Sequence, residues 1–256
     1  MKGAIIGDVV GSVYEFNPTQ NPTFPLLSED STFTDDTICT IAIADAFLHE
    51  KNYAEKLKYW CRKYPNPMGS YGNAFYSWIY NDDVKFTNNS CGNGALMRIS
   101  PICLADIPVT DALLQCSKAT ICSHNHPEAL DAVIAYMQIL RGLRKYKDKK
   151  IIHPIMNDAY GRKWRHYLPH TGVFIDTCVD TLRLATHLFL LSTSFEDAIR
   201  LAVLQGGDAD TLAAIIGGMA EAYYGVDEKL WEMVKPRLPG EFIEVVNQYY
   251  DIMGNL

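Results

Sequence analysis

The stretch GAIIGDVVGSVYEF, residues 3–16, places Gly3, Gly7 and Gly11 four positions apart in an otherwise mostly apolar run. On a helix this spacing puts all three glycines on one face. Glycine in a helix interior costs about 1 kcal/mol relative to alanine, so repeated glycines indicate a face that another backbone approaches closely. We therefore predict that this helix packs tightly in the centre of the protein.

A second stretch, TLAAIIGGMAEAYYG at residues 211–225, has a similar pattern of small residues. Ala214, Gly218 and Ala222 are again four positions apart and would form a face without bulk. Ordinary core packing would explain most of these small residues. The two stretches together predict two closely packed central helices.

Helical periodicity also dominates the rest of the chain, where apolar residues recur three and four positions apart. Clear examples are AEKLKYWCRKY, VTDALLQCSKATICSH, HPEALDAVIAYMQILRGLRKY, DTCVDTLRLATHLFLLS and FEDAIRLAVLQG. Strand-like alternation is almost absent. The sequence predicts an all-α protein of roughly ten to twelve helices, organised as a single domain over residues 1–256.

Composition excludes several classes of protein. The 256-residue chain has a net charge of -7 and no basic block, which argues against a stable nucleic-acid complex, because that affinity comes from clustered Lys and Arg. No run approaches the roughly 18 apolar residues that span a bilayer, so no membrane insertion is expected. The start MKGAIIGDVVG is unlike a signal peptide, which favours the cytoplasm. The seven cysteines are scattered without a CxxC pair and predict buried free thiols.

Acidic side chains gather near the ends of the expected helices. Asp8 and Glu15 share one face of the first glycine-rich helix. Thr34 is expected to cap the next helix, with Asp35 and Asp36 in its first turn. The helix dipole favours negative charge there by roughly 0.3 to 1 kcal/mol, which alone would explain this pair.

The same pattern recurs at Asp208, Asp210 and Thr211, where the second glycine-rich helix begins. If both acidic helix starts converge near Glu15, each carboxylate pair 4 Å apart would repel by about 4 kcal/mol at an effective dielectric near 20. Such a cluster needs a cation. Oxygen ligands without Cys or His suit Mg²⁺, Mn²⁺ or Ca²⁺ rather than zinc, and the hydroxyls of Thr34 and Thr211 could complete the shells. Two ions bridged by a shared carboxylate would fit five acids better than one ion.

Two further stretches could contact a ligand. Residues 90–94, SCGNG, form a glycine-rich turn whose backbone N–H groups could face a diphosphate, although a plain turn is the alternative. His124 and His126 are not expected to bind zinc, because no third soft ligand is near and His126 before Pro127 is typical of a helix start. The aromatic residues of 71–78, YGNAFYSW, could flank a base or an acceptor, but a core stripe explains them better.

Five stretches, in this order, resemble motifs of the ADP-ribosylglycohydrolase family: GAIIGDVVGSVYEF, FTDDT, SCGNGALMR, CSHNHPEA and GGDADTLAAIIGGMAEAYYG. Each motif alone is weak, but five in order, from residue 3 to about residue 225, are specific. The family includes dinitrogenase reductase-activating glycohydrolases and the ADP-ribosylarginine and ADP-ribosylserine hydrolases. The resemblance implies an all-α orthogonal bundle with two divalent cations, usually Mg²⁺ or Mn²⁺, that removes ADP-ribose from a modified acceptor.

The resemblance also implies roles for individual residues. The metal ligands would be Thr34, Asp35, Asp36, Asp208, Asp210 and Thr211. Glu15 matches the family glutamate at the end of the first helix, and Asp8 would support the metal site from behind. The phosphates and the ribose would contact Ser90, Gly92, Asn93, Gly94 and His124, with Ser123 in place of the threonine that precedes this histidine in the family.

The chemistry of a glycosidic bond suggests how these residues would act. Cleavage passes through an oxocarbenium-like transition state. The two cations would hold the ribose hydroxyls and polarise a water, while Glu15, Asp35 or Asp36 accepts its proton. We expect Glu15 to be this base, although it could instead act as a metal ligand or a gate.

The acceptor is not defined by these motifs. ADP-ribosylarginine or a related guanidine is expected, while serine, a nucleobase and a small free guanidine stay open, and the candidate acceptor segments are 17–30, 65–73 and 157–172. We expect a monomer that releases ADP-ribose. The alternatives are another binuclear Mg²⁺ hydrolase, such as a phosphoesterase, and a catalytically silent ADP-ribose binder.

Overall fold

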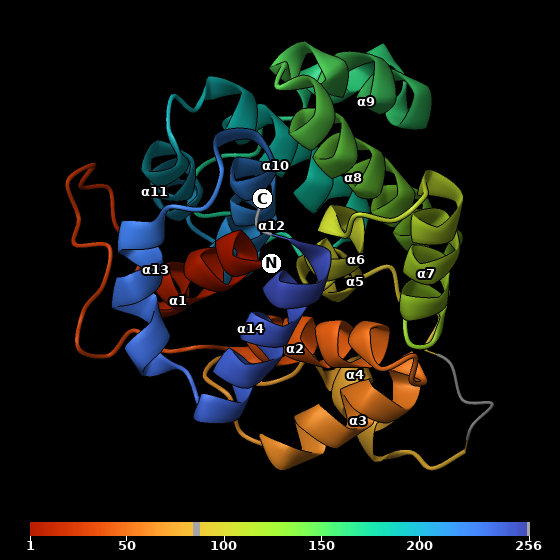
Figure 1. Ribbon diagram of the computed structural model, residues 1–256. Coiled ribbons are helices and arrows are strands. Elements are labelled where there is room, and N and C mark those ends of the chain that lie inside the picture. Colours follow the sequence, from red (N-terminus) through yellow and green to blue (C-terminus); the bar gives the residue numbers. More distant parts are fainter. Residues whose placement is uncertain (84–87, 255–256) are drawn as a thin grey trace.

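The computed structural model describes residues 1–83 and 88–254, and helices build all of its layers (Figure 1). Within these ranges there is no strand beyond two isolated bridges, which pair Thr34 with Met68 and Gly92 with Thr177. The α-helices are α1 (Lys2–Phe16), α2 (Asp35–Leu48), α3 (Tyr53–Lys63), α4 (Asn73–Tyr80), α5 (Gly94–Met97), α6 (Ser100–Leu104), α7 (Val109–Ile121), α8 (Pro127–Tyr146), α9 (Ile152–Tyr160), α10 (Cys178–Leu191), α11 (Phe195–Gln205), α12 (Ala209–Tyr224), α13 (Glu228–Val234) and α14 (Gly240–Met253). Short 3₁₀ turns lie at η1 (Lys149–Ile151), η2 (Arg162–His166) and η3 (Lys235–Arg237). The predicted all-α class is confirmed.

The described part of the chain holds fourteen α-helices, slightly more than the ten to twelve expected. The difference comes from short elements such as α5 and α6, which have four and five residues. A helix of one turn is too short to show a period of 3.6 residues, so hydrophobic periodicity cannot reveal it.

The central contact of the fold is between α1 and α12, which lie side by side near the middle of the molecule (Figure 1). The glycines of α1 make this contact possible. A Cβ atom on Gly7 would lie only 2.0 Å from the carbonyl oxygen of Ala213, and one on Gly3 would lie 2.2 Å from that of Gly217. The predicted close approach of the two glycine-rich helices is therefore confirmed.

The face of α12 that meets α1 differs from the predicted one. We expected Ala214, Gly218 and Ala222, but the residues one position earlier face α1, while Gly218 faces α8, where its Cβ would lie 2.3 Å from the Tyr136 hydroxyl. The reason is that every residue of Ala209–Ala222 is buried. A helix that is buried all round has no polar face from which its orientation can be read.

The remaining helices cover this central pair. Helix α2 packs against α3 and α14, α8 packs against α7, α9, α10 and α12, and α11 lies on α12 (Figure 1). One cluster of buried apolar residues runs through all of these layers. This arrangement holds α12 in the core with its N-terminal end beside α2.

Two further sequence predictions can be compared with the structure. All seven cysteines are free thiols, and all are buried except Cys91 and Cys122, which are half-buried. Within the described ranges, no helix combines the length and the apolar character that crossing a membrane requires.

Candidate metal centre and ligand pocket

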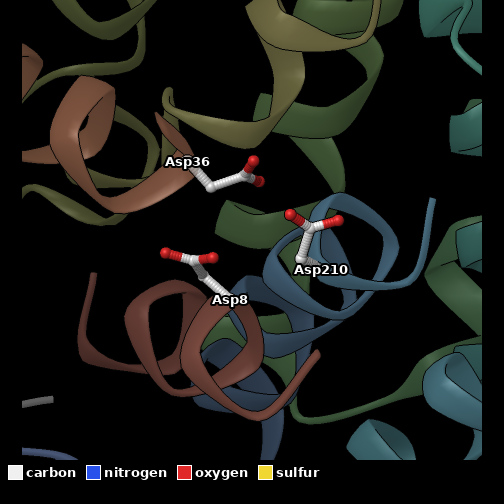
Figure 2. A group of neighbouring side chains, drawn as sticks. All are labelled: Asp8, Asp36 and Asp210. Carbon is white, nitrogen blue, oxygen red and sulfur yellow. The ribbon is translucent and has the colours of Figure 1, made fainter. Parts of the chain in front are cut away.

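The N-terminal ends of α2 and α12 meet beside α1 and bring five acidic side chains together. Asp8, Asp36 and Asp210 point into a common space (Figure 2), and each offers a carboxylate oxygen within 4.8 Å of the others. Glu15 and Asp208 form a second group of this kind with Asp210. Asp210 thus belongs to both acidic groups.

Asp35 takes a different position from its neighbour. Successive residues of a helix point about 100° apart, so Asp35 and Asp36 leave α2 in different directions. Asp36 faces Asp8 and Asp210, whereas Asp35 lines the adjoining cavity and belongs to neither group among the described residues. The expectation that both aspartates ligate metal therefore has closer geometric support for Asp36.

Asp8 ties α1 to the start of α2. Its Oδ1 accepts a hydrogen bond from the Thr34 hydroxyl at 2.7 Å, and its Oδ2 accepts the N–H groups of Thr34 and Thr37, each at 3.1 Å. The Thr37 hydroxyl also donates to Oδ2. A fully buried carboxylate that accepts four hydrogen bonds fixes the first turn of α2 and matches the supporting role expected for Asp8.

The two threonines also hold the acids in place. Thr34 caps α2, and its Oγ1 accepts the Asp36 N–H at 3.2 Å. The Thr211 hydroxyl donates to Asp36 Oδ2 at 3.0 Å and so links α12 to α2. Gly11 lets α1 approach Asp210, because a Cβ there would lie 2.5 Å from the Asp210 Cα.

Some carboxylate oxygens of this cluster have no hydrogen-bond partner. Asp36 Oδ1, Asp210 Oδ1 and Glu15 Oε2 are buried and unpaired among the described residues. Buried polar atoms in native proteins are almost always paired, so each exception calls for a missing partner such as an ion. These three oxygens mark where a cation would bind.

The electrostatics of the cluster agree with this. Burial, followed by the charge of Asp210, raises the pKa of Asp8 and the pKa of Glu15 to about 7 each. Burial raises the pKa of Asp36 well above its usual range, and the charges of Asp210 and Asp8 add to this effect. The pKa values of Asp35, Asp208 and Asp210 are also raised, and burial is the main cause in each case. Without a cation the protein therefore disfavours ionisation of its own acids.

The donor set fits a hard divalent cation. The two acidic groups offer only carboxylate oxygens, with threonine hydroxyls beside them. Mg²⁺, Mn²⁺ and Ca²⁺ prefer such ligands, whereas zinc prefers sulfur and nitrogen. Each acidic group could hold an ion, and Asp210 is placed to serve both.

A cavity of about 510 Å³ opens beside these acids. Its lining includes members of the second acidic group together with Asp35, the turn at Ser90–Gly94, and His124. The cavity that Glu15 and Asp208 line is therefore also lined by the residues that we expected to contact a ligand, Ser90, Gly92, Asn93 and Gly94. A volume of this size suits a ligand as large as a nucleotide.

The glycine-rich turn is partly occupied by its own hydrogen bonds. The Asn93 N–H donates to the Asp176 carbonyl at 2.7 Å, and the Gly92 N–H donates to Ser90 Oγ at 3.1 Å. The Asn93 side chain donates to Asp208 Oδ2 at 2.6 Å. Two of the backbone donors expected to face a diphosphate thus point into the protein, and Asn93 connects the turn to the acids.

The two histidines differ as expected. His126 caps α8, where its Nδ1 accepts the Glu128 N–H at 3.2 Å, which confirms the helix start predicted before Pro127. His124 is 4% exposed and lines the cavity. A Cβ on Gly94 would lie 3.3 Å from His124 Nε2, so this nitrogen faces the glycine-rich turn.

Sequence reasoning missed several residues of the cavity wall. Arg98 lines the cavity although its side chain is 0% exposed, and the only sequence signal was a single charge within the apolar run ALMRISPI. Phe174 and Asp176 also line it. Of the three segments expected to meet the acceptor, only 65–73 contributes to this lining.

The aromatic stretch 71–78, which overlaps segment 65–73, contributes to both the core and the cavity lining. Tyr71 and Phe75 are buried in the apolar core and also line the cavity. The Tyr71 hydroxyl donates to the Tyr64 carbonyl at 2.7 Å, so it is held in place by the protein itself.

Comparison with known proteins identifies relatives of this chain. A glycohydrolase of Rhodospirillum rubrum that acts on ADP-ribosyl-[dinitrogen reductase] is 28% identical over 206 residues, which is 76% of this chain and 70% of the relative. An ADP-ribosylarginine hydrolase of Pseudomonas putida is 25% identical over 281 aligned positions, which cover 95% of this chain and 72% of the relative. A solved structure described as an ADP-ribosylglycohydrolase-related protein complex superposes with a TM-score of 0.75 at 25% identity and covers 98% of this chain and 95% of its own.

The family model of ADP-ribosylglycohydrolases matches residues 1–253, which is nearly the whole chain. The matched residues include the helices that carry both acidic groups. They also include the other residues that line the cavity. This protein belongs to the ADP-ribosylglycohydrolase family.

Proposed function

We propose that this protein hydrolyses the glycosidic bond between ADP-ribose and a modified acceptor, with two divalent cations, Mg²⁺ or Mn²⁺, at the acidic groups. The observation that carries the proposal is that unpaired carboxylate oxygens of Glu15 and Asp210 adjoin a nucleotide-sized cavity that the glycine-rich turn and His124 also line. Family membership and the names of the relatives point to the same reaction.

The residues of the chain divide the work as follows. Asp36, Asp208 and Asp210, with Thr34 and Thr211, would hold the cations, and Asp35 would complete the site from the cavity side. Bound cations would supply charge stabilisation for the ribose hydroxyls and for the water. Asp8 would keep the start of α2 in place.

Glu15 would accept the proton of the attacking water. Its Oε2 is buried without a hydrogen-bond partner and lies beside the cavity, so it can receive a proton there. Carboxylates on this side would also stabilise the positive charge that develops at the anomeric carbon. Asp35, which lines the same cavity, is the second candidate for this role.

One acid of the cavity is left to meet a cationic acceptor. Within the described part of the chain, Asp176 is an exposed acid of the lining that is not assigned to the cations or to the water. We therefore propose ADP-ribosylarginine or a related guanidine as the substrate, with release of ADP-ribose. The proposed enzyme is a cytoplasmic monomer without a stable nucleic-acid partner.

The test combines product analysis with metal dependence. The protein would be incubated with ADP-ribosylated arginine, serine and nucleic acid in Mg²⁺, in Mn²⁺ and in EDTA, and the products separated by chromatography. We expect free ADP-ribose from the arginine substrate only when a cation is present. Release of phosphate or a nucleotide would instead indicate a phosphoesterase, and binding of ADP-ribose without turnover would indicate a silent binder.

Substitutions in the site should remove activity without unfolding the protein. Asp35→Ala and Asp210→Ala should each abolish metal-dependent turnover and leave the helical content unchanged. Asp251→Ala, which removes an exposed acid of α14, is the matched control and should keep full activity. Full activity of either site variant would contradict the two-metal proposal.

A further inference from the structure

Behind the glycine-rich turn, three buried polar side chains form a chain of hydrogen bonds. Arg98 follows α5, while Ser123 and His124 lie in the turn after α7, and their exposed fractions are 0%, 0% and 4%. Arg98 Nη2 donates to Ser123 Oγ at 2.6 Å and to the Ala119 carbonyl at 3.2 Å. Ser123 Oγ lies 2.9 Å from His124 Nδ1.

The direction of the second hydrogen bond follows from counting hydrogens. A guanidinium can only donate, so Ser123 Oγ accepts from Arg98. The hydroxyl has a single hydrogen, and the acceptors beside it are His124 Nδ1 at 2.9 Å and the sulfur of Cys122. If Nδ1 carried a hydrogen, the Ser123 O–H would be left with a weakly accepting sulfur in a place closed to water, which is costly. Ser123 therefore donates to Nδ1, and Nδ1 is the unprotonated nitrogen.

The charge of Arg98 acts in the same direction. Within the described residues no carboxylate pairs with it, and its guanidinium carbon lies 5.5 Å from the centre of the Phe75 ring. Its Nε and Nη1 have no hydrogen-bond partner. Such an uncompensated positive charge repels a second one nearby, and burial together with Arg98 lowers the pKa of His124 well below 6.5. The imidazolium form is thus disfavoured.

We propose that Arg98 and Ser123 are positioning residues that hold His124 as the neutral tautomer with its hydrogen on Nε2, so that this N–H donates to an oxygen of the bound ligand. Nε2 faces the turn, since a Cβ on Gly92 or Gly94 would lie 3.7 or 3.3 Å from it. A phosphate or ribose oxygen of ADP-ribose supplies the acceptor, and in this respect the inference rests on the proposed function. This role explains why Arg98 is buried, because Arg98 acts through Ser123 to keep the hydrogen of His124 on Nε2, the nitrogen that faces the ligand.

The tautomer can be measured directly and without ligand. Nitrogen NMR of protein labelled at its seven histidines, with His124 assigned by its loss in His124→Gln, reports which ring nitrogen carries hydrogen. We expect the wild type to have hydrogen on Nε2 alone. Ser123→Ala should give mixed tautomers, and Ser123→Thr, which restores a hydroxyl, should restore the single tautomer. A wild-type signal from the Nδ1–H form or the imidazolium would overturn the proposal.

A pair of amide variants tests the direction of the donor. The side-chain NH₂ of His124→Gln reaches the place of Nε2, whereas that of His124→Asn reaches only the place of Nδ1. By calorimetry with ADP-ribose we expect the Gln variant to bind about tenfold more tightly than the Asn variant, the difference made by about one hydrogen bond. Equal affinities of the two variants would contradict the proposed direction.

These measurements distinguish a failure of the proposed function from a failure of the proposed positioning of His124. If the wild type has the Nε2–H tautomer but does not bind ADP-ribose, the proposed function is wrong and the positioning of His124 stands. If Ser123→Ala does not fold, as judged by thermal unfolding, the wild-type spectrum and the amide pair still decide the question.

Discussion

The two walls of the cavity have opposite electrostatic properties. On the acidic wall, Glu15 and Asp210 each have a buried oxygen without a hydrogen-bond partner among the described residues, and burial raises their pKa values. On the opposite wall, His124 is held through Ser123 beside the buried charge of Arg98, and its pKa is lowered. The unpaired atoms of the acidic wall are carboxylate oxygens, whereas those beside His124 are the Nε and Nη1 donors of Arg98. One wall is thus built to receive cations and the other to present a neutral donor.

The two walls also differ in what holds them in place. The acidic wall depends on close contact between the α1 and α12 backbones, where no side chain can move aside. The histidine wall depends on hydrogen bonds between side chains. A substitution that disturbs the α1–α12 contact should therefore lower the free energy of unfolding much more than a substitution that removes a hydrogen bond beside His124.

The largest effect is expected from Gly7→Ala. The new Cβ would lie 2.0 Å from the Ala213 carbonyl oxygen, so the two helices would have to separate. We expect a loss of about 3 kcal/mol or more in the free energy of unfolding, measured with urea, because a buried backbone cannot relax as a side chain can. Gly240→Ala in α14 is the control, since nothing lies within 4 Å of its Cβ position. Wild-type stability of Gly7→Ala would contradict the packing argument.

The second effect concerns the metal-free protein and pH. The folded-state pKa values of Asp8 and Glu15 are about 7, above their unfolded values near 4, so the folded state binds more protons between these limits. Stability should therefore fall as pH rises from 5 to 8, by about 2 to 3 kcal/mol from the fully buried Asp8 and by less from the half-buried Glu15. Thermal unfolding in EDTA measures this loss, and saturating Mn²⁺ or Mg²⁺ should abolish it. Constant stability in EDTA over this range would show that the pKa values of Asp8 and Glu15 are not raised in the folded protein.

Asp36→Asn sharpens this test. The amide oxygen can still accept the hydrogen bond from Thr211, but one buried charge is gone. In EDTA at pH 8 the variant should unfold at a higher temperature than the wild type, while its metal-dependent activity is lost. A lower unfolding temperature in EDTA would mean that Asp36 stabilises the fold rather than the cation.

The acidic wall was largely predictable from the sequence, and the physical reason is local. A helix start is indicated by Thr34, Asp35 and Asp36, and a second one by Asp208 and Asp210. The glycines at helical spacing in α1 indicate that another helix packs closely against it. The sequence did not reveal that Asp36 and Asp35 face different spaces. That division depends on the rotation of α2, which its mostly apolar surface leaves undefined.

The histidine wall was much less predictable. Arg98 donates a hydrogen bond to Ser123, which lies 25 residues away in the chain, and no local sequence pattern links the two residues. Asn93 was expected to contact the ligand, and the structure adds that its side chain donates to Asp208 across a separation of 115 residues. Long-range hydrogen bonds of this kind depend on tertiary packing and leave little trace in hydrophobic periodicity.

The smallest effect is expected on the histidine wall and has the opposite dependence on pH. The pKa of folded His124 lies well below 6.5, so the unfolded state binds more protons as pH falls through that value. The stability that comes from neutral His124 is fully present above pH 6.5 and is lost at lower pH, by at most about 1.4 kcal/mol for each pH unit. His124→Gln should remove this loss, so with saturating Mg²⁺ the difference in stability between wild type and variant should shift in favour of the variant from pH 7.5 to pH 5.5. His170→Gln, at an exposed histidine, should produce no such shift. A pH-independent difference for His124→Gln would mean that the pKa of His124 is the same in the folded and unfolded states, and the contrast between the two walls would then disappear.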